Sequence, residues 1–320
     1  MQRLFGFLFI LSFCIGLSIP TKAQQLAQYT MYTFNHFGIN PAAPGDPKCM
    51  AAKIGYRNQW VGFEGNPVSE FLSIQAAIPP RNRNFRKGYS STGLYLENDQ
   101  TGPTRYTGFY LNYAYHRTMV KETYLSIGLF AGTMMYNYDK NAVITASQTD
   151  NAITASKTKF IFPDINPGIW IHNDNAYAGL SIKNVIGNSL TKVYGINSKL
   201  TRHFYLNAGY RWLSQDKSFS LIPSIMLKYT PYGAPGVDFN FLYDYYDKFD
   251  LGVSYRLIDG ASAMFRIKMG KFIYLSYAYD YNTSKIKIAS NNTHEVMLHF
   301  KLCKSKDGID KPREICPAYQ

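Results

Sequence analysis

The feature that most constrains this chain is a period-two alternation of apolar and polar side chains, which recurs from Lys48 to Leu302. Read with that period, the stretch divides into about fourteen strand-like segments of roughly nine to sixteen residues. The most regular are HFYLNAGYRW at 203–212, KFDLGVSYRL at 248–257 and GASAMFRIKM at 260–269. Because successive side chains of a strand point to opposite faces, each segment has one apolar face and one polar face. The chain is therefore predicted to be all-β.

Two classes of all-β protein fit this alternation, a transmembrane antiparallel β-barrel and a soluble periplasmic sandwich. Aromatic residues make up 16% of the chain and charged residues only 17%, which suits the lipid-facing band and aromatic girdles of a membrane barrel. The connections also alternate, because one set is mostly short and the other holds every long loop, including residues 139–163 and 184–200. Short periplasmic turns opposite long extracellular loops are typical of outer-membrane barrels. We predict such a barrel, with about fourteen strands, over residues 48–302.

The chain opens with a basic residue, an apolar run and a small-residue end, MQRLFGFLFILSFCIGLSIPTKA. This order predicts a secretory signal peptide over residues 1–23, cleaved before Gln24. The run is short for a spanning helix, which disfavours the alternative of an anchor retained in the inner membrane. Residues 24–47 are then an N-terminal periplasmic or plug segment, and residues 303–320 a periplasmic C-terminal tail. An even number of strands places both termini in the periplasm, at the outer membrane of a diderm bacterium.

The formal net charge of +13 raises the question of nucleic-acid binding. The basic residues are scattered, the leader predicts export and no nucleic-acid module is present, so a lumen or periplasmic face that meets acidic partners is the better explanation. One loop, PRNRNFRKG, gathers four basic residues around an aromatic: Arg81, Arg83, Phe85, Arg86 and Lys87. We hypothesise that this loop docks an acidic periplasmic component. The plainer alternative is a solvated basic turn.

The stretch YRNQWVGF ends the first predicted strand. If the alternation continues, Tyr56 and Trp60 face lipid, with Trp60 at the outer rim, while Arg57 and Gln59 face the lumen. Asn58 then points toward lipid, which predicts either a bulge or a protein contact on the outer wall. The four residues from Arg57 to Trp60 are therefore candidate partner-binding residues.

Three cysteines follow the predicted leader, at Cys49, Cys303 and Cys316. In a closed barrel the first and last strands are antiparallel neighbours, so Cys49 and Cys303 lie together at the periplasmic end of the closing seam. Two disulfides are then open. Cys49 with Cys303 would staple the seam, whereas Cys303 with Cys316 would fold the tail back.

No pattern in the chain indicates catalysis. The six histidines are dispersed, and the chain contains no HExxH, paired CxxC, nucleophile-elbow or phosphate-loop motif. His294 and Glu295, and likewise Asp244, Asp247 and Asp250, are more simply interpreted as lumen and turn residues than as acid–base or calcium sites. We assign no catalytic residue, no metal site and no cofactor.

Several motifs occur together and in a defined order: INPAAPG, YRNQWVGFEGNP, GLYLENDQTGP, FPDINPGIW, AYAGLSIKNV and HEVMLHF. They span nearly the whole mature chain and resemble the PorP/SprF family, outer-membrane proteins of the type IX secretion and gliding motility machinery of Bacteroidota. The resemblance implies a barrel without enzymatic activity that takes part in protein transport. It also implies protein partners, either a secreted surface adhesin or periplasmic ring, motor and peptidoglycan-binding lipoprotein components.

The INPAAPG motif precedes the first strand and supplies a candidate plug motif, Asn40, Pro41 and Ala42. Pro41 fixes the backbone and Asn40 can satisfy a turn, so the motif either gates or docks a partner, or merely turns the chain into the first strand. An NPA element and fourteen strands also make the chain resemble the FadL hydrophobic-substrate channels. A transporter of small hydrophobic molecules is therefore the alternative function. It requires an apolar lumen, whereas the predicted inward faces carry Ser, Gly, Asn, Arg and Lys.

Overall fold

The computed structural model describes residues 26–303, apart from residues 46, 48, 79–87, 121–122, 140–158, 191–198, 232, 247, 258, 285–287, 289 and 291. The predicted signal peptide, the basic residues of the PRNRNFRKG loop and Cys316 lie outside the described residues. Within the described ranges, no helix is long and apolar enough to cross a membrane.

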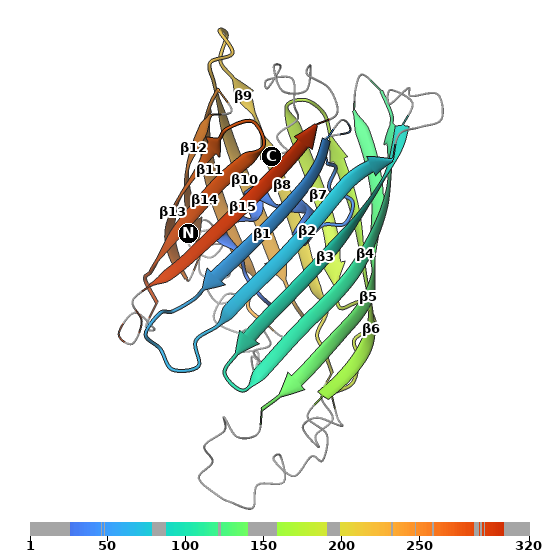
Figure 1. Cartoon of the computed structure of the whole chain (residues 1–320), viewed down its shortest axis with the longest axis vertical. Coiled ribbons are helices and arrows are strands. Elements are labelled where there is room, and N and C mark those ends of the chain that lie inside the picture. The colour runs from blue at the N-terminus through green and yellow to red at the C-terminus, as the bar shows by residue number, and fades with distance from the viewer. Residues whose placement is uncertain are drawn as a thin grey trace, which may run out of the picture.

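The described strands form one antiparallel sheet that curves into a barrel (Figure 1). In chain order they are β1 Cys49–Asn58, β2 Val68–Ile78, β3 Gly88–Thr101, β4 Thr104–Thr118, β5 Tyr124–Tyr138, β6 Lys159–His172, β7 Ala176–Lys183, β8 His203–Tyr210, β9 Trp212–Leu213, β10 Phe219–Tyr229, β11 Gly236–Tyr245, β12 Phe249–Arg256, β13 Gly260–Met269, β14 Ile273–Asn282 and β15 Thr293–Cys303. The long hairpins from β3 to β6 follow the clean alternation of their sequences.

The sheet closes on itself, because β1 pairs with β15 along its whole length and β10 pairs with both β8 and β11. Although the sheet has fifteen elements, β8 and β9 both pair with β10, so they are one barrel strand interrupted at Arg211. There the backbone N–H of Arg211 donates to the carbonyl of Asn175 at 2.6 Å. The barrel therefore has fourteen strands, which confirms the predicted fold class.

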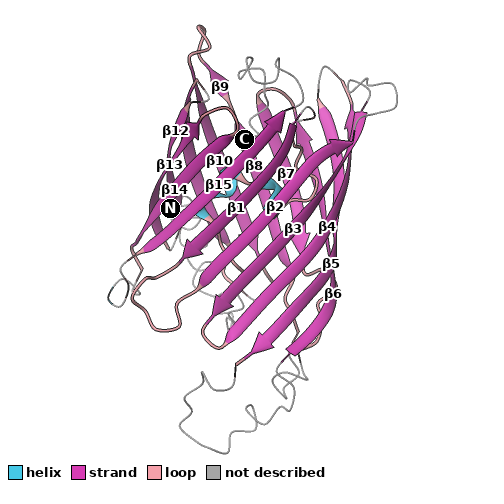
Figure 2. Ribbon diagram, in the orientation of Figure 1, coloured by secondary structure: helices cyan, strands magenta, loops and turns pink. Residues whose placement is uncertain are grey.

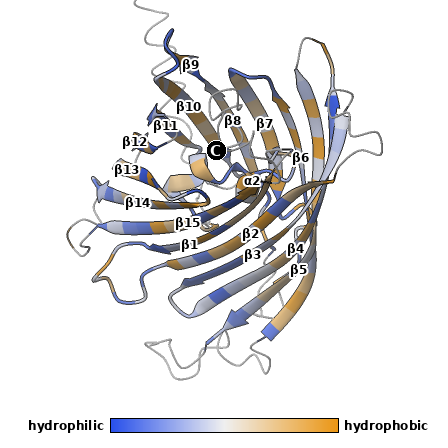
Figure 3. Ribbon diagram, turned by 45° about the horizontal axis from the view of Figure 1, so that its top comes forward, coloured by the Kyte–Doolittle hydropathy of each residue, from blue (hydrophilic) through white to orange (hydrophobic). Residues whose placement is uncertain are grey.

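Hydrophobic and hydrophilic residues follow one another along the strands (Figure 3), and their side chains lie on opposite faces of the wall. On β12, Leu251, Val253 and Tyr255 are 54%, 58% and 52% exposed, whereas Asp250 and Ser254 are buried toward the lumen. An apolar outer face is the arrangement that a lipid bilayer requires of a barrel.

Exposed aromatic side chains gather near the strand ends. Tyr210 and Trp212 are half-exposed at one rim, and Tyr229, Tyr255 and Tyr281 at the other. Amphipathic rings at both edges of the apolar band are expected where a barrel meets the two membrane interfaces.

The connections divide between the two rims. The rim that holds the β1–β2, β3–β4, β5–β6, β7–β8 and β14–β15 connections includes the longest one, 139–158, and is called the loop rim below. The opposite rim holds the β2–β3, β4–β5, β6–β7 and β13–β14 connections, together with Cys49 and Cys303, and is called the turn rim.

The N-terminal segment lies inside the barrel. It contains two short helices, η1 Thr30–Phe34 and α2 His36–Ile39, which Figure 2 shows within the ring of strands. Every residue from Tyr29 to Pro44 is buried. Aromatic and apolar side chains of this segment pack against the inner wall, including Phe37 on Phe130 with ring centroids 5.0 Å apart. Residues 26–45 therefore form a plug, and the name is kept below.

Candidate functional site

A cluster of buried charges surrounds the first residues of the plug. Arg57 on β1 forms ion pairs with Asp280 on β14, at 2.7 Å, and with Glu295 on β15, at 2.8 Å. The strand register explains the arrangement, because Arg57 and Glu295 are cross-strand partners on the closing seam of the barrel. All three side chains are almost wholly buried, so the mutual pairing offsets a large desolvation penalty.

Thr30 joins the plug to these charges. Its backbone N–H donates to Glu295 Oε2 at 2.7 Å, and its hydroxyl donates to Asp280 Oδ2 at 2.8 Å. The same hydroxyl accepts a hydrogen bond from Arg57 Nη1 at 2.9 Å. We call Thr30, Arg57, Asp280 and Glu295 the seam cluster, since it fixes the first turn of the plug to the seam.

Further ion pairs continue from the seam cluster around the lumen. Asp238 lies 3.4 Å from Arg256 and 2.9 Å from Lys228, and Arg256 also donates to the Thr30 hydroxyl at 3.4 Å. Deeper in the lumen, the guanidinium of Arg266 on β13 lies over the ring of the plug residue Phe34, 4.6 Å from its centroid, and is paired with Asp250. This side of the lumen therefore carries paired charges beside buried apolar side chains such as Met264 and Met297.

The NPA motif is held by neutral hydrogen bonds instead. The Nδ2 of Asn40 donates to the carbonyls of Ile169 on β6 and Leu180 on β7, at 3.0 and 3.1 Å. Its Oδ1 accepts from the backbone N–H of Ala42 at 2.9 Å, which closes a turn around Pro41. Asn40 thus makes the predicted turn and also bridges two wall strands.

Two wall glycines leave the space that this motif occupies. A Cβ added at Gly168 would lie 2.1 Å from Asn40 Oδ1, and one added at Gly128 would lie 2.4 Å from the carbonyl oxygen of Pro41. That same carbonyl accepts from Asn112 Nδ2 at 3.0 Å. Gly168 belongs to the FPDINPGIW motif, so two motifs that are far apart in the sequence meet here.

The plug leaves the lumen at the turn rim. Gln75 Nε2 donates to the carbonyl of Ala43 at 2.8 Å, and the chain then enters β1 at Cys49. Cys49 is the register partner of Cys303 and is disulfide-bonded to it. Of the two pairings that the sequence left open, this is the one in the structure, and Cys316 lies outside the described residues.

The YRNQW residues separate into different environments. Arg57 and Gln59 face the lumen, but the prediction that Trp60 faces lipid at the outer rim is wrong. β1 ends at Asn58, and Trp60 then adopts a φ of +57° in the β1–β2 loop and lines a lumen cavity. Of the two alternatives for Asn58, the bulge is wrong, because its register with both neighbouring strands is continuous. Its side chain accepts a hydrogen bond from Asn66, and a protein contact on the outer wall stays a prediction.

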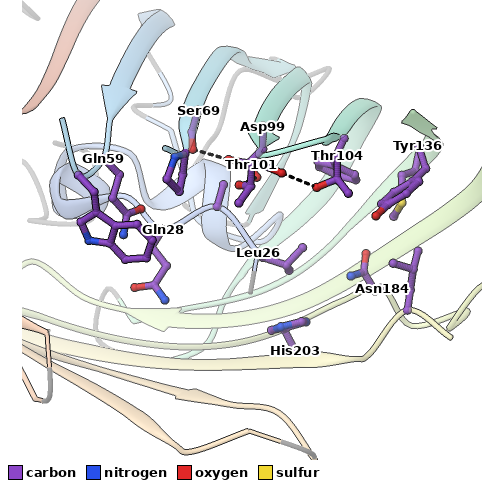
Figure 4. A pocket seen from close by; sticks show the side chains of 16 residues that line it. Leu26, Gln28, Gln59, Ser69, Asp99, Thr101, Thr104, Tyr136, Asn184 and His203 are labelled. Carbon is purple, nitrogen blue, oxygen red and sulfur yellow. Dashed lines mark hydrogen bonds between the residues drawn. The ribbon is translucent and has the colours of Figure 1, made fainter. Parts of the chain in front are cut away.

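A cavity of about 480 Å³ lies at the loop rim beside the start of the plug (Figure 4). The plug contributes Leu26 and Gln28 to its lining. The wall and the β1–β2 loop contribute aromatic and polar side chains, among them Gln59, Trp60, Asp99, Tyr106, Tyr136 and Asn184. His203 also lines the cavity, which is therefore mixed in character, with aromatic rings, amides, an imidazole and one carboxylate.

Sequence reasoning missed Asp280 and Asn112, and it treated Glu295 only as a general lumen residue. Finding these residues requires both the strand register and the path of the plug through the barrel. Among the described residues, no group of three His, Cys, Asp or Glu side chains is placed to hold a metal ion. Outside the described residues lie the four basic residues of the β2–β3 loop, Arg81, Arg83, Arg86 and Lys87, and Phe85 among them.

Solved structures with a similar fold are outer-membrane channels. The Ralstonia pickettii toluene transporter TbuX matches with a TM-score of 0.53 and 9% identity, over 89% of this chain and 96% of that chain. The CymD monoaromatic hydrocarbon channel matches with a TM-score of 0.52 and 10% identity, over 87% of this chain and 94% of that chain. At these identities the likeness concerns the barrel fold alone. No curated protein matches this chain by sequence.

The sequence itself matches a family over nearly its whole length. The model of the family described as type IX secretion system membrane protein PorP/SprF covers residues 21–300. The matched range includes the plug, thirteen complete barrel strands and most of β15. This chain is therefore a member of the PorP/SprF family, a membrane barrel of the type IX secretion system.

Proposed function

We propose that this barrel is a non-enzymatic scaffold that anchors protein partners of the type IX machinery at the outer membrane. The partners would be either a secreted surface adhesin or periplasmic ring, motor and peptidoglycan-binding components. The observation that carries the proposal is the plug, which is buried from Tyr29 to Pro44 and bonded to the wall at both ends. A filled lumen suits a rigid support better than a conduit.

The proposed orientation places the loop rim outside the cell and the turn rim in the periplasm. The longest connection, residues 139–158, belongs to the loop rim, as is usual for extracellular loops. The end of β15 at Cys303 belongs to the turn rim, so residues 304–320 would continue into the periplasm. A secreted adhesin would then meet the loop rim, and ring or motor components the turn rim.

The basic loop between β2 and β3 is the proposed periplasmic contact. Its charged residues, Arg81, Arg83, Arg86 and Lys87, connect two strands at the turn rim, and Phe85 among them could anchor a partner by burial. Clustered positive charge favours an acidic partner and speeds its association.

The alternative is a FadL-like transporter of small hydrophobic molecules. Two channels of similar fold carry names that refer to toluene or monoaromatic hydrocarbons. Transport of such molecules calls for an apolar route through the barrel. The buried ion pairs of Arg57, Asp238 and Arg266 and the plug between them support the scaffold instead.

The experiment is a pull-down of the tagged full chain from native outer membrane in mild detergent, followed by mass spectrometry. A matched variant carries glutamine at positions 81, 83, 86 and 87. Recovery of a large secreted adhesin, or of periplasmic ring or peptidoglycan-binding lipoproteins, supports anchoring. Loss of only the periplasmic proteins in the variant assigns their contact to the basic loop. Recovery of only lipid or a small hydrophobic ligand would favour the transporter.

A further inference from the structure

The cavity at the loop rim combines three aromatic rings with neutral polar groups. Trp60, Tyr106 and Tyr136 come from the β1–β2 loop, β4 and β5, and each is only partly buried. Gln28, Gln59 and Asn184 add amide groups, which can donate or accept hydrogen bonds. Figure 4 shows polar side chains from the plug and from opposite parts of the wall around the same space. Such a lining can hold a flat, polar group between aromatic faces.

Trp60 reaches this cavity through an unfavourable backbone conformation. A φ of +57° is uncommon for a residue other than glycine and is disfavoured for a bulky one. The conformation is held by hydrogen bonds across the seam, because Trp60 N–H donates to Thr293 Oγ1 at 3.1 Å and Val61 N–H donates to the Asn292 carbonyl at 2.9 Å. The loop thus turns the indole inward, where it contributes nothing to the lipid-facing girdle.

Asp99 supplies the cavity with a carboxylate. It accepts hydrogen bonds from the hydroxyls of Ser69, at 2.5 Å, and Thr101, at 3.3 Å. Among the described residues it forms no ion pair, whereas Glu97, two residues earlier on the same face of β3, is paired with Lys183 at 3.4 Å. A partly buried carboxylate without a cation is the group in this cavity that a positively charged ligand would satisfy.

We infer that this cavity receives an arginine side chain from a polypeptide that docks at the loop rim. A guanidinium is planar, donates hydrogen bonds to a carboxylate and stacks on aromatic faces, so it matches Asp99 and the three rings together. The amides of Gln28, Gln59 and Asn184 can bond the backbone of the same polypeptide with the capacity that remains after Gln28 Oε1 accepts from Lys228 and Asn184 Nδ2 donates to Thr201. The inference rests on the proposed anchoring function and names the chemistry by which the partner is recognised.

The test measures binding of N-acetyl-arginine amide to the detergent-solubilised full chain by ligand-detected NMR. N-acetyl-citrulline amide has the same shape without the charge, and we expect it to bind about tenfold more weakly. Asp99→Asn is expected to weaken the arginine probe by about tenfold and to leave the citrulline probe unchanged. Glu70→Gln is the matched control, since Glu70 lies at the same height on the outer face of the neighbouring strand and bonds only Asn98 in the described part of the chain.

Equal binding of the two probes, no binding of either, or unaltered arginine binding in Asp99→Asn would overturn the inference. Tighter binding of maltotriose than of the arginine probe would overturn it in favour of a saccharide site. If Asp99→Asn fails to fold, the comparison of the two probes on the unaltered protein decides alone. None of these outcomes depends on the pull-down, so the anchoring function can stand when this site fails.

Discussion

The two ends of the plug are attached to the wall by different kinds of interaction. Near the loop rim, Thr30 depends on charges that β1, β14 and β15 bring together at the closing seam. Near the turn rim, Asn40 and Pro41 depend on neutral amide hydrogen bonds and on the space left by two wall glycines. Charge pairing therefore holds one end of the plug, whereas neutral hydrogen bonds and close packing hold the other.

The difference predicts how each end fails. A buried charge cluster is tolerable only while every charge has a partner, so the loss of one member leaves the others unpaired. A substitution at a neutral contact removes only the hydrogen bonds of that residue, or fills only the space beside it. The free energy of unfolding should therefore fall more on a single substitution in the seam cluster than on one around Asn40. Neutralising the remaining charges of the cluster should restore more of the loss.

The largest effect is expected for Arg57→Met. Asp280 and Glu295 would remain buried without their cation, which should lower the free energy of unfolding by about 3–5 kcal/mol. Denaturant unfolding of the detergent-solubilised chain measures this. Combining the change with Asp280→Asn and Glu295→Gln removes the unpaired charges and should restore much of the loss. An Arg57→Met protein as stable as the unaltered one would refute the role given to the seam cluster.

At the neutral end, Asn40→Ala should lower the free energy of unfolding by about 1–3 kcal/mol, because the carbonyls of Ile169 and Leu180 lose their donor. Asn40→Asp should be worse, since it keeps the size of the side chain but turns an acceptor toward two acceptors. The same unfolding experiment compares the two variants. Equal effects would mean that the amide donor of Asn40 contributes nothing.

Gly168→Ala tests the close packing at the neutral end. It should lower the free energy of unfolding by about 1–3 kcal/mol, because the new methyl collides with Asn40. In an Asn40→Ala background the same change should cost less, since only the contact with Pro41 Cδ at 2.9 Å would remain, and a double-mutant cycle of unfolding free energies measures the difference. Gly233→Ala, in the β10–β11 loop, is the control, since among the described residues its Cβ would meet only the Thr230 side chain, with the methyl at 3.2 Å. Additive effects of the first two changes would contradict the proposed collision.

The smallest loss of stability is expected for Gln75→Ala, which removes the hydrogen bond to the Ala43 carbonyl where the plug leaves the lumen. A loss of about 1 kcal/mol in unfolding free energy is expected. Gln100→Ala, at an exposed site on β3, serves as the control and should change stability by less than about 0.5 kcal/mol. If the two variants were equivalent, the exit of the plug would not depend on this bond.

The sequence predicts the wall of this barrel better than its contents. Alternation alone identifies which side chains of 248–257 face lipid, because the strand period is two and the environments on the two faces differ. It also places Cys49 beside Cys303, since the ends of the first and last strands must meet when the barrel closes. Both inferences need only the local sequence pattern and the closure of the barrel.

The contents of the lumen depend on information that no local pattern carries. The contact of Arg57 with Asp280 requires the shear of three strands, and the contact of Asn40 with Gly168 requires the path of a plug across the barrel. Trp60 lies on the side that the alternation does not predict, because β1 ends at Asn58 and the period of two does not hold in the turn with positive φ that follows. Continuing a periodicity beyond the end of an element predicts the wrong face.

The proposed anchoring function requires that the plug seals the barrel, so that the barrel is a support and not a channel. The most direct test is the conductance of the purified full chain in a planar lipid bilayer, with a variant lacking residues 26–45 measured beside it. We expect no steady open-channel current from the unaltered protein and a stable ohmic current from the variant. A steady open-channel current from the unaltered protein would contradict it.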